Sequence, residues 1–427
     1  MSPEIISLLI VLGCIVLFIT RPIPNAATAC LGCLLFALTG VCSLADAFSG
    51  FSNTTVLLMF GMMVVGIAMM DTGAAKLIGK YVTKASAGKE KLFILFAGTA
   101  SALLSTFLSN TAVIAIFLPI IASVAQSNEN MSRKNMTLPV TMGAMFGGVC
   151  TLVGSTPQLT ANGILSEMTG KELQMFDFLM PGIVIFLVYM TFVLTIGYKM
   201  GNKVWGNQEE IEANEKEIKA ADELANLVVN KRKLITMLII FVITIVLFIG
   251  SWISTAMTAI IAALLCIMTG CTTQKSVIKN MDWSVVFVLA GCLGIASGLT
   301  KSGAGELMAD VLSKFITADV SPMVVFGFFV FATMLISNFI TNSTAVVITL
   351  PIALAFCSAS GYNVIPFTLG IVYAANLTFS TPLANAQTAM TLVAGYKFSD
   401  YIKYTWLLDI LVFAAIVISV PLFFPLV

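Results

Sequence analysis

The sequence predicts an all-α polytopic membrane protein, built as an inverted repeat of five spanning helices plus one re-entrant hairpin per half, with two broken helices. Of its 427 residues, 59% are hydrophobic and only 10% are charged, whereas soluble domains carry about 25% charged residues. Several apolar stretches reach the roughly 17–25 residues that cross a bilayer as a helix. A polar, helix-breaking motif also occurs twice inside strongly apolar sequence.

The repeated motif is a carboxamide between two hydroxyl residues. It reads Ser-Asn-Thr at 109–111 and Thr-Asn-Ser at 341–343, and each copy is followed by a Ser-Thr-Pro break, at 155–157 and at 380–382. Backbone groups left unpaired in hydrocarbon cost several kcal/mol each, so such breaks are tolerated where they line a cavity. The pattern therefore favours a transporter.

Histidine is absent from the sequence. This excludes His-based metal ligation, Ser–His or Cys–His catalysis and His proton relays. No GxSxG or HExxH arrangement is present either. We therefore expect a protein that is not an enzyme.

Hydropathy places five spanning helices in each half. They lie near 4–20, 24–42, 54–72, 137–170 and 176–198, and near 233–249, 253–270, 284–300, 362–395 and 404–425. The helices near 137–170 and 362–395 are broken by the Ser-Thr-Pro segments. Two further apolar pairs, 92–126 and 321–358, carry the Asn motif near their middle. Each flank has about 16 residues, short for a crossing, which predicts re-entrant hairpins.

The chain repeats its landmarks in the same order about 230 residues apart. The segment Gly61–Leu77 matches Gly291–Leu307, Asn110 matches Asn342, and Ser155–Pro157 is matched with Ser380–Pro382 at an offset of 225. This predicts a first repeat over 1–200, a cytoplasmic linker over 201–232 and a second repeat over 233–427.

The distribution of basic residues predicts the orientation. With the first hairpin entering from the cytoplasm, 19 Lys and Arg fall inside and three outside, as the positive-inside rule requires. Both termini then lie outside, in a multi-pass protein of the plasma (inner) membrane. An odd number of crossings per half makes the repeat inverted, with a site at the midplane. Segments 74–90 and 302–316 read as interfacial amphipathic helices.

The motif chemistry suits two ligands at once. Hydroxyls, a carboxamide and freed carbonyls suit sodium, whereas freed N–H groups and helix N-termini favour an anion. Sodium and anion binding would then be coupled without a titratable side chain. Asp409, inside the last helix, is a further candidate for proton binding, with a solvated interfacial position as the alternative.

These features resemble the divalent anion/sodium symporter family of di- and tricarboxylate transporters over nearly the whole chain. The resemblance implies a first sodium site at Ser105, Ser109, Asn110 and either Gly154 or Ser155, and a second at Ser337, Thr341, Asn342 and Ser380. It implies substrate contacts at Asn110, Thr111, Thr156, Pro157, Asn342, Ser343, Thr381 and Pro382. The Thr-Asn-Ser order of the second motif departs from the family pattern, which leaves the substrate open.

The resemblance implies sodium-coupled symport of a small divalent anion, a di- or tricarboxylate, by alternating access in a homodimer. Sodium is the coupling ion, the anion and membrane lipid are the partners, and nucleic acid is not one. The alternatives are an anion exchanger, a sodium/proton-type antiporter or an anion channel.

Overall fold

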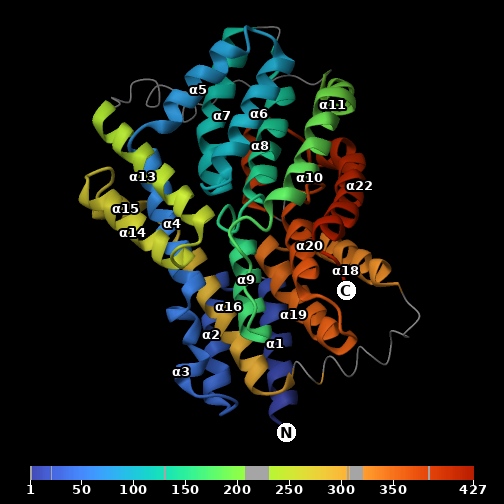
Figure 1. Ribbon diagram of the computed structural model, residues 1–427. Coiled ribbons are helices and arrows are strands. Elements are labelled where there is room, and N and C mark those ends of the chain that lie inside the picture. The colour runs from blue at the N-terminus through green and yellow to red at the C-terminus, as the bar shows by residue number, and fades with distance from the viewer. Residues whose placement is uncertain are drawn as a thin grey trace.

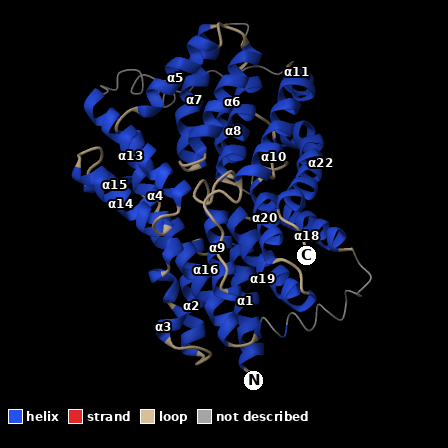
Figure 2. Cartoon of the chain, in the orientation of Figure 1, coloured by secondary structure: helices blue, strands red, loops and turns tan. Residues whose placement is uncertain are grey.

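The computed structural model describes residues 2–20, 22–128, 131–206, 230–304, 307, 321–382 and 385–427. Every regular element within these residues is a helix (Figure 2). The first half contains α1 Pro3–Thr20, α2 Asn25–Leu38, α3 Leu44–Ala47, the 3-10 turn η1 Ser49–Ser52, α4 Thr54–Asp71, α5 Ala74–Ala85, α6 Glu90–Ser105, α7 Asn110–Ser127, α8 Arg133–Gly148, α9 Thr156–Thr169, α10 Leu179–Phe192, the π-helical turn η2 Val193–Gly197 and α11 Tyr198–Trp205. The second half contains α13 Lys231–Gly250, α14 Thr255–Met268, α15 Gln274–Asn280, α16 Trp283–Lys301, α18 Pro322–Ser337, α19 Asn342–Ser360, α20 Val364–Asn376, α21 Ala386–Met390, the 3-10 turn η3 Thr391–Ala394 and α22 Phe398–Phe423.

The helices of the two halves correspond in order and in buried face. In α1 the buried positions are 7, 10, 14 and 18, and in α13 positions 237, 240, 244 and 248 are buried at an offset of 230. Gly73 and Gly303, at the ends of α4 and α16, both take a positive φ (81° and 74°) that glycine adopts at low cost. The repeat predicted from the sequence is therefore present in the fold.

The first three long helices of each half pack crosswise against those of the other half. Helix α4 packs along α14, and α16 packs along α2. Small residues permit the close approach, because a Cβ on Gly61 would lie 2.6 Å from the carbonyl carbon of Ala259, and one on Gly291 2.6 Å from Ala29 Cβ. These helices lie on one side and at the lower end of the view in Figure 1.

Each Asn motif lies at the turn of a helical hairpin. Helices α6 and α7 form the first hairpin and α18 and α19 the second, and each hairpin packs on the following helix, α8 or α20. Their buried faces match at an offset of 232 from Phe93 and Val325 to Ser105 and Ser337, with Leu104 and the half-buried Ile336 as the exception. The two predicted hairpins are thus confirmed as helix–turn–helix units.

Eight helical segments within the described residues are long and apolar enough to cross a membrane. They are α1, α4, α7, α10–α11, α13, α16, α19 and α22. The hairpin arms α7 and α19 run to 18 and 19 residues, longer than the predicted flanks, because capped N-termini start them at the Asn itself. Re-entrance of the hairpins therefore remains a prediction.

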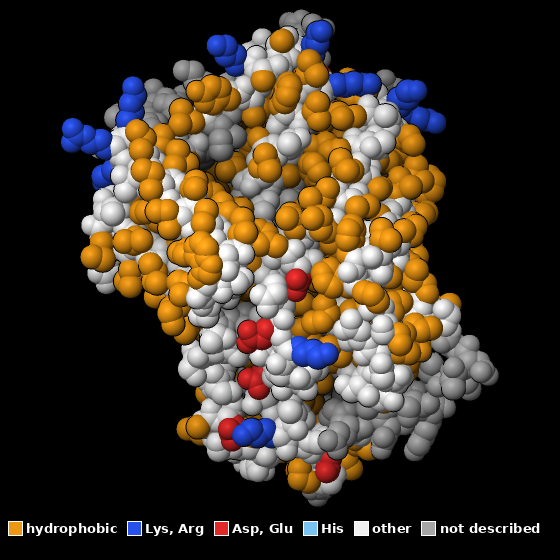
Figure 3. Space-filling view, in the orientation of Figure 1, with side chains coloured by type: hydrophobic (Ala, Val, Ile, Leu, Met, Phe, Trp, Pro, Cys, Tyr) orange, Lys and Arg blue, Asp and Glu red, His pale blue; other side chains and the backbone are white. Residues whose placement is uncertain are grey.

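Two helices unwind in the middle of the molecule, as predicted. The chain is non-helical between α8 and α9 and again between α20 and α21 (Figure 2). The interfacial helix predicted at 74–90 is α5, whereas most of 302–316 and of the linker lies outside the described residues. On the face seen in Figure 3, Lys and Arg side chains gather at the end that carries α5 and α11.

Candidate functional site

A cavity of about 820 Å³ lies between the hairpin turns, the first unwound segment and the helices α4 and α16. Both Asn motifs line it. Its polar lining residues are Asn25, Asp71, Ser109, Asn110, Thr111, Ser155, Thr156, Asn280, Asp282, Ser284, Thr341, Asn342, Ser343, Asn376, Asn385 and Gln387. One space therefore joins chemistry from both halves of the chain.

The two hairpin turns have the same internal hydrogen bonds. Ser105 Oγ donates to Asn110 Oδ1 (2.5 Å). Ser337 Oγ lies 3.3 Å from Asn342 Oδ1 and has its shorter hydrogen bond to Ala375 O (2.6 Å). Ser109 and Thr341 are the N-caps of α7 and α19, and each hydroxyl accepts a backbone N–H three residues on. Capping by a hydroxyl satisfies one free N–H of the helix start, so the remaining N–H groups of the first turn stay available at the cavity wall.

The second motif has one contact that the first lacks. The hydroxyls of Thr341 and Thr344 lie 2.6 Å apart, so the additional hydroxyl after Thr-Asn-Ser engages the N-cap itself. In the first motif the nearest hydroxyl pair is Ser109 and Thr111, at 3.4 Å. The departure in the second copy thus changes hydrogen bonding within the turn while Ser343 still lines the cavity.

The first unwound segment, 149–155, lies directly against the first hairpin turn. A Cβ on Gly148 would lie 2.0 Å from Asn110 Oδ1, and one on Gly154 would lie 2.2 Å from Gly148 O. Gln158 closes the segment by donating from Nε2 to Gly148 O (2.6 Å). Glycine at 148 and 154 therefore brings several oxygens together: the carbonyl of Gly148, the Asn110 side chain and the Ser105 hydroxyl behind it.

The second unwound segment repeats this arrangement at an offset of 230. Thr151 and Thr381 each donate to a carbonyl of the preceding hairpin turn, Thr106 O and Asn338 O. Ser155 is the N-cap of α9 and Asn385 that of α21.

The segment-closing contacts recur as well. Gln158 Nε2 donates to Thr151 O (3.4 Å), and Thr388 Oγ1 donates to Thr381 O (3.3 Å). The match of 155–157 with 380–382, at offset 225, is therefore wrong. The equivalents of 155–157 are residues 385–387. The matching hydrogen bonds establish this alignment of the two repeats, whereas the shared Ser-Thr-Pro sequence does not.

Most sequence-predicted site residues meet at the cavity. Those that line it are Ser109, Asn110, Thr111, Gly154, Ser155, Thr156, Pro157, Thr341, Asn342 and Ser343. Ser105 and Ser337 lie buried directly behind the Asn side chains.

Ser380, Thr381 and Pro382 are not among the lining residues. Ser380 instead donates to Asp409, and its hydroxyl lies 3.1 Å from that of Thr405. Asp409 is thus partly buried and does not line the cavity, and its Oδ1 is buried without a hydrogen-bond partner.

Sequence reasoning found Asn342 but missed three other carboxamides of the second half, Asn376, Asn385 and Gln387. Asn376, the last residue of α20, accepts from Ser155 Oγ (2.9 Å) and donates to Gln158 Oε1 (3.3 Å). It therefore ties the end of α20 to the start of α9 in the other half. Asn385 and Gln387, at the start of α21, also line the cavity. A carboxamide at the end of an apolar helix, next to a Ser-Thr-Pro break, was the signal available in the sequence.

The charged residues of the cavity wall are all acidic. Asp71 accepts a hydrogen bond from Thr272 Oγ1 (2.6 Å), and Asp282 caps α16 through Val285 N (3.3 Å). No Lys or Arg is among the described residues that line the space. The positive potential comes instead from the first turns of α7, α9 and α19, whose N-termini face the cavity.

Comparison with known proteins places the fold and the family. The chain is 25% identical over 420 residues to an uncharacterized transporter of Haemophilus influenzae, covering 92% of this chain and 86% of that one. It is 23% identical over 415 residues to the sodium-dependent dicarboxylate transporter SdcS of Staphylococcus saprophyticus, with 88% and 78% covered. The crystal structure of the Alcanivorax borkumensis YdaH transporter aligns over 99% of this chain and 98% of its own, with a TM-score of 0.65 at 12% identity.

The family profile described as "Citrate transporter" (CitMHS) matches residues 15–330. This range covers the first repeat, the linker and the first part of the second repeat. The resemblance seen in the sequence is thereby confirmed, and the protein is a multi-pass membrane transporter and not an enzyme. The chain belongs to the CitMHS citrate transporter family.

Proposed function

We propose that the protein is a secondary active transporter that carries a small divalent anion, a di- or tricarboxylate, together with sodium by alternating access. The observation that carries the proposal is the composition of the cavity wall. Two hairpin turns with matching Asn, Ser and Thr side chains face one space, and no basic side chain among the described residues accompanies them. The 23% identity to a sodium-dependent dicarboxylate transporter supports the coupling.

Electrostatics makes sodium the natural partner of the anion. A dianion in a cavity with Asp71 and Asp282 meets repulsion from the wall, and the helix N-termini offset only part of it, since each amounts to about half an elementary charge. Sodium bound at the two hairpin turns adds positive charge beside the anion. Binding of either ligand then lowers the free-energy cost of binding the other.

The first sodium site would use Ser105, Ser109, Asn110 and either Gly154 or Ser155. The fit is good because these residues supply hydroxyl, carboxamide and carbonyl oxygens from the hairpin turn and the unwound segment. The close approach of Gly148 and Gly154 adds backbone oxygen at the same place. Hard cations such as sodium favour oxygen ligands of this kind.

The second sodium site would use Ser337, Thr341 and Asn342, with Ser380 as the fourth predicted ligand. In the register of the hydrogen bonds, the position equivalent to Gly154 is residue 384, which lies outside the described residues. The engagement of Ser380 with Asp409 supports leaving Ser380 out of the proposed set.

The substrate would lie between the two motifs. On the first side we propose Asn110, Thr111, Thr156 and Pro157, all of which line the cavity. On the second side we propose Asn342 and Ser343, with Asn385 and Gln387 in place of Thr381 and Pro382. Carboxamides and helix-start N–H groups donate to carboxylate oxygens without adding net charge.

The same proposal includes the arrangement in the membrane. The gathering of Lys and Arg at the end with α5 and α11 (Figure 3) supports a cytoplasmic position for that end and an external position for the termini. Hairpins that enter from opposite sides, and a homodimer, complete the proposed arrangement by resemblance.

Uptake into proteoliposomes tests the proposal. Purified protein is reconstituted and offered labelled succinate, malate, citrate and sulfate, with an inward sodium gradient or with potassium in its place. We expect saturable accumulation of at least one di- or tricarboxylate that requires sodium. Sodium-independent counterflow would indicate an exchanger, flux coupled to a proton gradient an antiporter, and non-saturable flux a channel; each would overturn the symport.

A further inference from the structure

The cavity lies along only one end of each of the two equivalent helices α4 and α16. On α4 it is lined from Met59 to Asp71, toward the helix C-terminus, and on α16 from Ser284 to Val288, near the N-terminus. Both ends lie on the side that the proposed orientation makes cytoplasmic. The equivalents of the α4 lining, Leu289–Lys301 on α16, do not line the cavity. Equivalent faces of the two repeats therefore differ: the face on α4 lines the cavity and the face on α16 does not.

The equivalent face of α16 is covered by α9. Met63 and Ile67 of α4 are partly exposed, whereas their equivalents Leu293 and Ser297 are buried. Leu293 packs against Gly163 of α9 so closely that a Cβ on Gly163 would lie 2.1 Å from Leu293 Cδ2. In transporters built from inverted repeats, alternating access moves one bundle against the other. Withdrawal of α9 would open on α16 the face that is open on α4.

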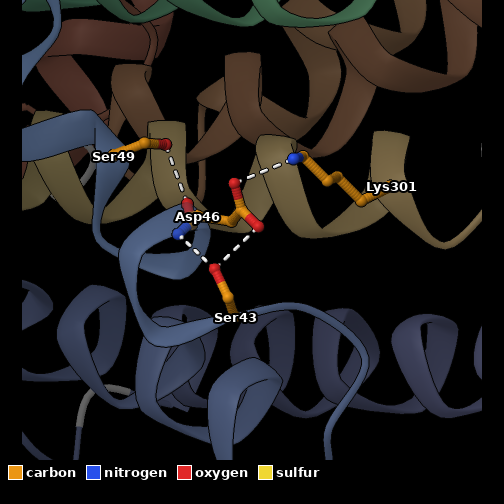
Figure 4. A network of polar contacts seen from close by, with 4 residues as sticks. All are labelled: Ser43, Asp46, Ser49 and Lys301. Carbon is orange, nitrogen blue, oxygen red and sulfur yellow. Dashed lines mark hydrogen bonds and ion pairs between the residues drawn. The ribbon is translucent and has the colours of Figure 1, made fainter.

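Lys301 is the last residue of α16 and follows that covered face, with its own side chain exposed. Its equivalent on α4 is Asp71, which lines the present cavity and keeps a hydrogen bond from Thr272. Lys301 Nζ donates to Asp46 Oδ1 (2.8 Å), and Ser43 holds the same carboxylate through Oδ2 (2.7 Å), as Figure 4 shows. These two hydrogen bonds, the one from Lys301 first, lower the pKa of Asp46.

The ion pair between Lys301 and Asp46 is exposed, and a second acidic side chain acts on Lys301. The side chains of Lys301 and Asp46 are 51% and 35% exposed, and pairs of this kind are worth about 0–1 kcal/mol. Glu167 of α9 lies near enough to interact with Lys301 electrostatically. Withdrawal of α9 would take Glu167 away and leave Lys301 with one exposed carboxylate partner.

We propose that Lys301 recruits the anionic substrate at the outer mouth of the cavity when α9 has withdrawn. Asp71 and Asp282 form the opposite, acidic mouth, from which the anion leaves. Lys301 then offers a cation to the anion at the outer mouth, whereas the charged residues that line the present cavity, Asp71 and Asp282, are both acidic. Affinity for the anion is therefore higher from the Lys301 side. This inference rests on the proposed transport of an anion.

Transport measured from each side tests the role of Lys301. Right-side-out and inside-out membrane vesicles give separate KM values for the two mouths, with labelled succinate or citrate as the probe. Lys301→Gln should raise KM from the Lys301 side about three- to fivefold, the size of one exposed charge interaction. The value of kcat and the KM from the other side should stay unchanged, and Lys301→Arg should retain the wild-type KM.

Asp46→Asn is the matched control. It frees Lys301 from its partner, so it should leave KM from the Lys301 side unchanged or lower it. A merely structural ion pair would give Asp46→Asn and Lys301→Gln the same defect, which would overturn the inference. If the wild type transports the anion and Lys301→Gln leaves KM unchanged from both sides, the inference is also overturned. Absence of sodium-driven anion transport in the wild type would instead contradict the proposed function.

Discussion

Ser155 and Asn385 occupy the same place in the two halves of the molecule, 230 residues apart, as N-caps of the helices that follow the two unwound segments. Ser155 Oγ engages Gln158 and Asn376, and Asn385 Oδ1 accepts from the Thr388 backbone N–H (2.8 Å). The two halves therefore present different chemistry to one cavity, a hydroxyl on one wall and a carboxamide on the other.

Replacing the central carboxamides should weaken sodium coupling at each turn. Asn110→Ala and Asn342→Ala each remove an oxygen that a buried serine hydroxyl holds in place. We expect each to reduce sodium-driven uptake at least tenfold and to raise the sodium concentration needed for half-maximal uptake. Membrane insertion and folding, checked by size-exclusion elution, should be retained. Unchanged sodium dependence in both variants would contradict the site.

The register of the second wall is testable by contrasting two variants. Gln387→Ala changes a lining residue and should raise the substrate KM. Thr381→Val removes a hydrogen bond to Asn338 O, so it should lower thermal stability by about 1 kcal/mol and leave KM unchanged. The opposite result, a KM effect in Thr381→Val alone, would restore the register read from the Thr-Pro letters.

Gly148 should tolerate no side chain. In Gly148→Ala the added Cβ would lie 2.0 Å from Asn110 Oδ1, which displaces the carboxamide and should abolish uptake. Gly327→Ala, in α18, is the control because nothing lies within 4 Å of its Cβ. It should be neutral or stabilise the helix by up to about 1 kcal/mol. Equal uptake by the two variants would argue against close packing at this turn.

Asn376 should link substrate binding to the contact between halves. Asn376→Leu keeps much of the side-chain volume but leaves Ser155 and Gln158 without their partner in α20. Ser155 and Gln158 keep their hydrogen bond to each other, so we expect a loss of about 1 kcal/mol in stability, the net contribution of a hydrogen bond, together with a raised KM. The melting temperature measured with and without substrate separates the two effects. If substrate raises the melting temperature of Asn376→Leu as much as that of the wild type, Asn376 has no role in binding.

Much of the fold could be predicted from the sequence because hydropathy and helix-breaking residues report directly on helices. The Asn-centred turns, the broken helices and the repeat were all recognisable, since a polar residue in an apolar run is an unambiguous landmark. The register of 385–387 was not recognisable, because Ser380–Pro382 resembles the first break in letters while its side chains bond elsewhere. The state of the cavity could not be predicted either, because the burial of equivalent apolar residues such as Met63 and Leu293 depends on which helix packs on them.

Equilibrium binding tests the central claim, that sodium and the anion share one cavity and stabilise each other. Binding of the labelled anion to purified protein is measured across a sodium titration at constant ionic strength with potassium. The account predicts that the Kd of the anion falls as sodium rises, and that the anion tightens sodium binding by the same factor. An anion Kd that is equal in sodium and in potassium would contradict it.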